Sequence, residues 1–148
     1  GIPAGQTTDA LCYLFDVLPT LGRLCGVAGP ATSEGRDLGP VLRDPTQSGR
    51  SELMFAYKNV QRAIRDDRWK LIRYPQVDQT QLFDLKADPF ETSNLADQPA
   101  HAAKQAELTA RLQRLMKDFG DTNLLSVASP KPAAWTPPPP AAKSPPKP

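Results

Sequence analysis

The chain has 148 residues, which is enough for one ordinary domain and too few for two full ones. Its 18 Lys and Arg residues nearly balance 16 Asp and Glu, and a net charge of +2 argues against a nucleic-acid-binding protein. No apolar run approaches the roughly 20 residues that a membrane-spanning helix needs. The sequence begins at Gly1 without an initiator methionine or a signal peptide, so we expect a missing upstream segment.

Residues 7–25 are predicted to be helical. Thr7, Thr8 and Asp9 are good capping residues, and Gly26 is a typical C-terminal stop. Apolar residues follow at helical spacing: Leu11, Leu14, Phe15, Leu18, Leu21, and Leu24 or Cys25. Because proline is tolerated only in a first helical turn, Pro19 predicts either a kinked helix or two short ones.

The two cysteines, Cys12 and Cys25, are too few for a disulfide scaffold. In a continuous helix they would lie roughly 20 Å apart, beyond disulfide reach, unless the helix breaks sharply at Pro19. The only histidine is His101, so a zinc site is disfavoured. We therefore expect two buried, inert thiols.

Residues 26–50 are so rich in glycine and proline that they predict a surface connection without long elements. Leu38, Val41 and Leu42 fit one helical turn, but they cannot bury much apolar surface alone. We expect them to be anchored on a larger core that lies outside this sequence.

Residues 52–85 predict four short antiparallel strands separated by turn residues, at 53–57, 60–65, 69–74 and 81–85. Asp66, Asp67 and Arg68 fit a tight hairpin turn, because Asp tolerates the backbone angles and can bond its own backbone. Polar and apolar residues alternate imperfectly in the second and third strands, so neither face of the sheet is expected to be cleanly solvated.

A loop at residues 86–99 leads to a predicted amphipathic helix at about 100–119. Its apolar stripe comprises Ala103, Leu108, Leu112, Leu115, Met116 and Phe119. Four short strands and one helix make a small two-layer α+β unit.

The C-terminal residues, 121–148, predict a disordered tail rich in Pro, Ala and Lys. Nine prolines and three lysines follow Ser129 without an acidic residue, and the rest of the chain has 15 basic and 16 acidic side chains. The tail is expected to sample polyproline II, and its basic residues account for the positive net charge. Its P-x-x-P spacing suits aromatic-groove domains, although a spacer or tether is the favoured interpretation.

The residues that usually carry catalysis or bind metals are sparse. His101 begins a polar helical turn, which favours a solvated surface residue over a catalytic base. Asp66 and Asp67 are better explained by turn formation than by metal binding, because adjacent side chains in a hairpin point apart. The sequence therefore offers no catalytic, metal-binding or cofactor-binding residue.

The one candidate site is a group of cationic residues in the second and third strands and their turn. Its proposed anion contacts are Arg62, Arg65, Arg68 and Lys70, with Arg73 nearby. They suit an anionic ligand, but long basic side chains also commonly solvate sheet edges.

A series of short motifs resembles the C-terminal portion of the formylglycine-dependent, arylsulfatase-like sulfatases. Residues 16–21 are similar to D-x-x-P-T-L, residues 25–27 to x-G-V, and residues 34–42 to D-G-x-S-L-x-P-x-L, with Glu34 and Asp37 replacing the usual Asp and Ser. Residues 65–72 resemble R-x-x-x-W-K-L-I, and residues 82–95 resemble L-Y-D-L-x-x-D-P-x-E-x-x-N-L. The resemblance covers roughly residues 5–118, in order.

This resemblance implies an α/β, alkaline-phosphatase-like fold, of which the chain is a fragment. Residues 1–50 would be the end of the large domain, a helix plus an irregular connection. Residues 51–120 would be the C-terminal α+β subdomain, a four-stranded antiparallel sheet packed on a long helix. Residues 121–148 would follow as the tail.

The resemblance also implies hydrolysis of sulfate esters, on a sulfated small molecule or glycan, by the complete protein. The resemblance implies calcium and formylglycine in the missing N-terminal part, since in the family the elements that hold them precede the point corresponding to Gly1. Neither Cys12 nor Cys25 lies in the required C-x-P-S-R context, so neither is expected to be the converted residue. This chain alone is thus expected to be inactive, and a periplasmic or secreted protein is expected. Two alternatives stay open: a non-catalytic module that binds an anionic glycan or a protein, and the C-terminal part of a related phosphoesterase or phosphonate hydrolase.

Overall fold

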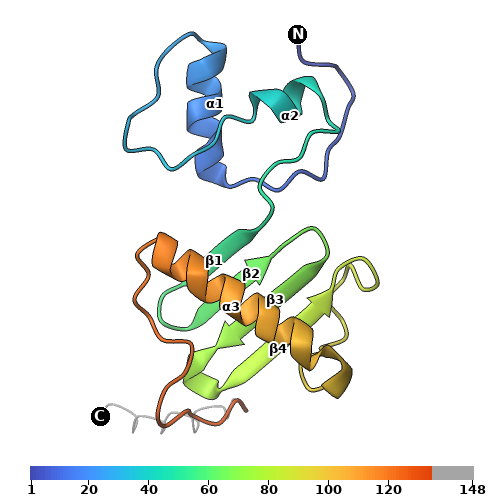
Figure 1. The fold of residues 1–148 in the computed structure, drawn as a ribbon, viewed down its shortest axis with the longest axis vertical. Helices are drawn as coiled ribbons and strands as arrows, with labels where there is room; N and C mark the ends of the chain where they lie inside the picture. The colour runs from blue at the N-terminus through green and yellow to red at the C-terminus, as the bar shows by residue number, and fades with distance from the viewer. Residues whose placement is uncertain (135–148) are drawn as a thin grey trace, which may run out of the picture.

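The computed structural model describes residues 1–134, which form a small two-layer domain preceded by an N-terminal helical segment (Figure 1). Tyr13 of this segment packs on the domain, where its ring meets Phe55 and Phe119. In chain order the helices and strands are α1 (Val17–Leu24), α2 (Gly39–Arg43), β1 (Leu53–Tyr57), β2 (Gln61–Arg65), β3 (Trp69–Tyr74), β4 (Gln79–Asp84) and α3 (Ala102–Asp118). Three short 3-10 turns are η1 (Leu14–Asp16), η2 (Pro75–Val77) and η3 (Pro99–His101). Among residues 1–134, no helix combines the length and apolarity needed to cross a bilayer.

The four strands form an antiparallel meander in the order β1-β2-β3-β4, as the sequence predicts. Ile64, Leu71 and Leu82 are aligned across β2, β3 and β4, and each is at most 1% exposed. The observed bounds differ from the predicted ones by no more than two residues at any strand end. Val60 lies outside β2 because its N–H bonds Tyr57 O in the β1–β2 turn, at 3.0 Å.

Helix α3 packs across one face of this sheet (Figure 1). Leu108, Leu112 and Met116 recur every four residues, and all three are buried against the aligned row of the sheet. The predicted stripe is confirmed at these positions, but Ala103 and Phe119 are exposed. They lie near the two ends of the helix, where it extends beyond the sheet.

The opposite face of the sheet is also apolar. Ala63, Ile72 and Phe83 are buried there, with Tyr74 and Leu85 packed against them. Side chains alternate between the two faces of a strand, so two apolar faces produce the imperfect alternation seen in the sequence.

The predicted helix at 7–25 is wrong in its first half. Only Val17–Leu24 is α-helical, and Leu11 instead forms an isolated antiparallel bridge with Arg50. Because Pro19 lacks an N–H, it fits the first turn of α1 and not the interior of a longer helix. The predicted stop is confirmed, since Gly26 has a φ of +69° directly after the helix.

The N-terminal segment, residues 1–50, has almost no core of its own. Val41, on the single turn of α2, is its only buried apolar residue. Cys12 and Cys25 are free and exposed, so the prediction of buried thiols is wrong for the chain as described. Both thiols lie in this segment, which lacks the packed layers needed to bury them.

The beginning of the C-terminal segment packs on the domain. Leu125 contacts the core beneath α3, and its carbonyl accepts a hydrogen bond from Arg73 Nε at 2.7 Å. Further on, Lys131 N–H donates to Gln76 O at 2.8 Å. The segment predicted as a tail thus begins with residues that contact the sheet. The predicted polyproline II character of residues 135–148 lies outside the described residues.

Candidate functional site

The cationic residues predicted as an anion site are divided between the two faces of the sheet. Arg62 is opposite Arg73, and both are on the α3 side with Ile64 and Leu71. Arg65 is opposite Lys70, and that pair is on the other face. The register therefore does not gather these side chains on one surface.

Most of these cations also have anionic partners. The guanidinium of Arg62 is buried and bonds Asp121, Arg68 bonds Asp84 at 2.7 Å, and Lys70 bonds Glu91 at 2.7 Å, while Arg73 bonds Asp78. The hydrogen bond from Arg62 holds the pKa of Asp121 at about 2. Within residues 1–134, Arg65 is the one member of the predicted group without a carboxylate partner. This arrangement does not favour recognition of an anionic glycan by the hairpin.

Asp66 stabilises the β2–β3 turn, as its turn chemistry predicts. Its Oδ1 accepts hydrogen bonds from Arg68 N–H at 3.0 Å and Trp69 N–H at 2.6 Å. Burial raises the pKa of Asp66, but these bonds and that from Arg111 outweigh burial and lower it. Asp67 instead points to exposed Lys86. Across residues 1–134, no three His, Cys, Asp or Glu side chains are grouped as a metal site.

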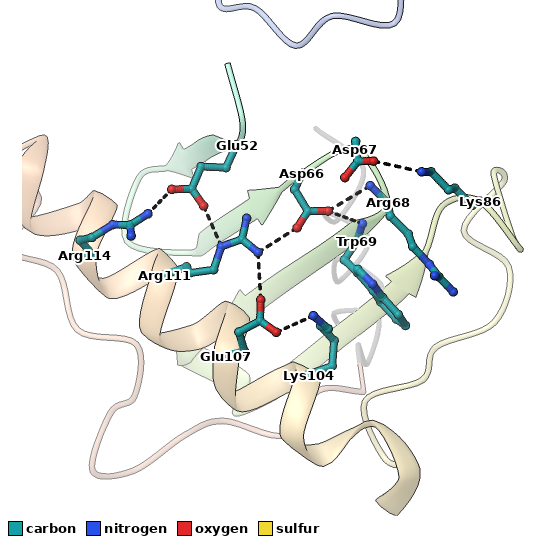
Figure 2. Close-up of polar contacts among 10 residues, drawn as sticks. All are labelled: Glu52, Asp66, Asp67, Arg68, Trp69, Lys86, Lys104, Glu107, Arg111 and Arg114. Atoms are coloured by element: carbon teal, nitrogen blue, oxygen red, sulfur yellow. Dashed lines mark hydrogen bonds and ion pairs between the residues drawn. The ribbon is translucent and has the colours of Figure 1, made fainter. Parts of the chain in front are cut away.

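Arg111 of α3 is the centre of the largest polar network (Figure 2). It bonds Glu52 at 2.8 Å, Asp66 at 2.9 Å and Glu107 at 3.1 Å. Burial lowers the pKa of Arg111, but the three carboxylates outweigh burial and raise it. Arg114 also bonds Glu52, so the network joins α3 to the start of β1 and to the β2–β3 turn. The sequence did not predict this network, because Arg111 is 45 residues from Asp66 and 59 residues from Glu52.

The N-terminal motifs converge on Asp16, which is fully buried. Its carboxylate bonds Arg50 through Nε at 2.9 Å and Nη2 at 2.5 Å, and it accepts the N–H groups of Tyr13 and Arg36. Burial raises the pKa of Asp16, but these bonds outweigh burial and hold it at about 2. Thr20 adds a second link, because its Oγ1 accepts Leu38 N–H at 2.8 Å.

Gly35 is also required by this packing. A Cβ at that position would lie 2.3 Å from Phe15 O, which is far inside van der Waals contact. The D-x-x-P-T-L and D-G-x-S-L resemblances are thus explained by links within the N-terminal segment.

The motif at residues 82–95 makes similar links beside β4. Asp84 and Glu91 pair with cations of the β2–β3 hairpin. The Asn94 side chain accepts Leu82 N–H at 2.9 Å and donates to Thr80 O at 3.1 Å, so it occupies the open edge of β4 as another strand would. His101 lies beside Trp69, with ring centroids 5.7 Å apart. The motif residues Asp84, Glu91 and Asn94 thus link β4 and the loop after it to the rest of the sheet.

The most prominent exposed apolar surface lies on and around α1. Leu18, Leu21 and Leu24 are each more than half exposed, and Leu14 is 89% exposed. Arg23 is the only charged residue within α1. Contiguous exposed apolar side chains on a helix mark a surface that another protein part covers.

Residues 1–118 match the family model described as N-sulphoglucosamine sulphohydrolase, C-terminal. The chain belongs to this sulfatase family. It is 31% identical, over 82% of its length, to an N-acetylglucosamine-6-O-sulfatase from Bacteroides thetaiotaomicron, of which the match covers 24%. It is 32% identical, over 68% of its length, to a multifunctional alkaline phosphatase superfamily protein from Trinickia caryophylli, of which 23% is covered.

A solved structure of a protein in complex with its substrate D-glucosamine-2-N,6-O-disulfate aligns with a TM-score of 0.72 and 28% identity. The alignment covers 82% of this chain and 27% of that one. The predicted sulfatase resemblance and alkaline-phosphatase-like fold are thereby confirmed. The chain spans about a quarter of the length of each of these three proteins.

Proposed function

We propose that this chain is the C-terminal part of a hydrolase that removes sulfate from a sulfated amino sugar. Its family membership supports sulfate ester hydrolysis. The substrate class is supported by two similar proteins, one named for N-acetylglucosamine 6-O-sulfate and one solved with a disulfated glucosamine. The chain spans about a quarter of these relatives. We infer that the catalytic residues lie in a part of the protein outside this sequence.

The apolar face of α1 is the observation that supports a separate catalytic part, on which this chain would pack. Burying a leucine side chain contributes roughly 1.5–3 kcal/mol, so leaving Leu14, Leu18, Leu21 and Leu24 in water forgoes a large stabilisation. We infer that these side chains pack on the catalytic part. The Asp16–Arg50 ion pair would then hold α1 in the orientation that this contact needs.

Calcium and a formylglycine are proposed to belong to the same catalytic part. The described residues do not fit calcium, because no three of their His, Cys, Asp or Glu side chains are grouped as metal ligands. Cys12 precedes Tyr13 and Cys25 precedes Gly26, so neither has the sequence context that the conversion needs. Residues 1–148 alone are therefore expected to be inactive. We also propose that the complete protein is periplasmic or secreted. Fractionation of cells that express the complete protein tests this location.

Turnover of an aryl sulfate tests the proposed reaction. The complete protein, produced with its formylglycine-generating partner, is expected to release sulfate, whereas residues 1–148 release none. The isolated chain is also expected to bind a hydrophobic dye, and Leu18→Asp with Leu21→Asp should reduce that binding. Robust turnover by residues 1–148, or failure of the complete protein to release sulfate from both the aryl sulfate and sulfated amino sugars, would overturn the proposal.

A phosphoester or phosphonate hydrolase is the second candidate. The 32% identity to a multifunctional alkaline phosphatase superfamily protein supports this candidate. An aryl phosphate diester and an aryl phosphonate, assayed beside the aryl sulfate, distinguish them. Faster turnover of the phosphorus esters by the complete protein would favour this candidate.

A further inference from the structure

Tyr13 belongs to the N-terminal segment, but its hydroxyl bonds the backbone of β1. The phenol oxygen accepts a hydrogen bond from Met54 N–H at 2.5 Å and donates one to Met54 O at 3.1 Å. Because β1 is an edge strand of the sheet, alternate residues have backbone groups that point away from β2. At Met54 a single side-chain hydroxyl therefore takes the place of a neighbouring strand.

The Tyr13 ring is held by side chains from both parts of the chain. It stacks on Phe15 of the N-terminal segment with ring centroids 4.6 Å apart, and it meets Phe119, directly after α3, edge to face at 6.2 Å. The Arg50 guanidinium lies over the ring, 4.8 Å from its centroid. Burial raises the pKa of Tyr13, so the phenol keeps the proton that it donates to Met54 O.

The main chain of Tyr13 belongs to a different network, the one around Asp16. Tyr13 N–H donates to Asp16 Oδ2 at 2.7 Å, and the same carboxylate binds Arg36 N–H and the Arg50 guanidinium. Asp16 is fully buried, so these bonds fix the Tyr13 backbone within the N-terminal segment. Tyr13 is thus bonded to the N-terminal segment through its main chain and to the sheet through its side chain.

Few other polar contacts join the two parts. Within the described residues, the two bonds between Tyr13 and Met54 are the only hydrogen bonds between residues 1–50 and residues 51–134. The one ion pair of the N-terminal segment, Arg50 with Asp16, is internal to that segment. The direction of the N-terminal segment relative to the sheet therefore depends on Tyr13 and the aromatic contacts around it.

We propose that Tyr13 couples the N-terminal segment to the small domain, so that the Asp16 network and the edge of β1 open and close together. Loss of the hydroxyl contact frees the backbone of Met54 and lets the segment change its angle to the sheet. This coupling does not depend on the proposed function. Where α1 packs on a catalytic part, as proposed above, Tyr13 also sets the orientation of the small domain relative to that part.

Amide hydrogen exchange of the full chain tests the hydroxyl contact. Met54 N–H is expected to be protected, whereas Ala56 N–H, two residues further along the same open edge, is expected to exchange fast. Tyr13→Phe keeps the ring and removes the hydroxyl, so exchange at Met54 should accelerate about tenfold. Exchange at Leu71, in a strand paired on both sides, should not change, because the domain stays folded.

Asp16→Asn tests the coupling, because it weakens the network that holds the Tyr13 backbone. Exchange at Met54 should accelerate in this variant, and the same substitution should add nothing in a Tyr13→Phe background. Asp44→Asn is the matched control. Asp44 also bonds residues of the N-terminal segment, Thr46 and Gln47, but does not bond Tyr13, so exchange at Met54 should keep the parent rate.

Three results would overturn the proposal. Equal exchange rates at Met54 and Ala56 in the parent chain, or an unchanged rate at Met54 in Tyr13→Phe, would contradict the hydroxyl contact. Acceleration at Leu71 as large as that at Met54 would mean that Tyr13→Phe destabilises the whole domain. Equal effects of Asp16→Asn and Asp44→Asn on Met54 would contradict coupling through Tyr13.

Discussion

Arg111 in the middle of α3 donates a hydrogen bond to Asp66 in the β2–β3 turn, across 2.9 Å. The same guanidinium bonds Glu52 just before β1, so one side chain links the helix to two separate parts of the sheet (Figure 2). The packing of Leu108, Leu112 and Met116 sets which face of α3 meets the sheet. The network around Arg111 then fixes how the helix lies along it.

Replacing Arg111 by alanine is predicted to destabilise the small domain by about 1–3 kcal/mol, because Glu52 and Asp66 lose a partner while they are mostly buried. Urea denaturation of the full chain measures the change. Arg114→Ala is the matched control: its side chain is 59% exposed, so we expect a loss below about 1 kcal/mol. Equal losses in the two variants would contradict the central position of Arg111.

Leu112→Ala is predicted to lower the free energy of unfolding by about 2–5 kcal/mol, since Leu112 is fully buried against the sheet. Leu124→Ala removes the same atoms from a side chain that is 73% exposed, and its effect should stay within about 0.5 kcal/mol. Thermal unfolding of the two variants checks this difference. Similar melting temperatures would mean that the α3 interface is not formed in solution.

Asp16 and Asp121 predict a loss of stability in acid. Each has a folded-state pKa of about 2, below the ordinary value of 3.8, because each bonds an arginine in the folded protein. A lowered pKa contributes stability that is present above pH 3.8 and is lost as the pH falls through about 2. The free energy of unfolding, obtained from urea denaturation at pH 6 and at pH 2, should therefore fall by on the order of 2 kcal/mol for each group.

Asp121→Asn isolates one of these contributions. The variant is expected to be less stable than the parent chain at pH 6 and to approach it as the pH falls toward 2, because the parent then loses the same ion pair. A constant difference across this range would show that Asp121 does not titrate with a lowered pKa.

Asn94→Ala is predicted to expose the open edge of β4. Leu82 N–H and Thr80 O would lose their side-chain partner, and the free energy of unfolding should fall by about 1–2 kcal/mol. Hydrogen exchange at the Leu82 amide should accelerate more than exchange at Leu71, which is in a strand paired on both sides. Unchanged protection at Leu82 would argue against this role of Asn94.

The sheet and α3 could be predicted from the sequence because their signals are local. Apolar spacing located Leu108, Leu112 and Met116, and turn chemistry located Asp66. The N-terminal segment was predicted less well. Leu11 pairs with Arg50, which lies 39 positions further along the chain, and the periodicity of the sequence does not reveal such a contact. The cationic hairpin was predicted as one cluster because charge can be counted in a sequence. Its division between two faces depends on strand register and on acidic partners such as Asp121 and Glu91.

Sulfate release from N-acetylglucosamine 6-sulfate by the complete protein tests the central claim most directly. Ion chromatography measures free sulfate, and residues 1–148 assayed in parallel serve as the comparison. The proposed function predicts sulfate release by the complete protein and none by residues 1–148. Sulfate release by these 148 residues alone, or none from any sulfated amino sugar by the complete, formylglycine-containing protein, would contradict it.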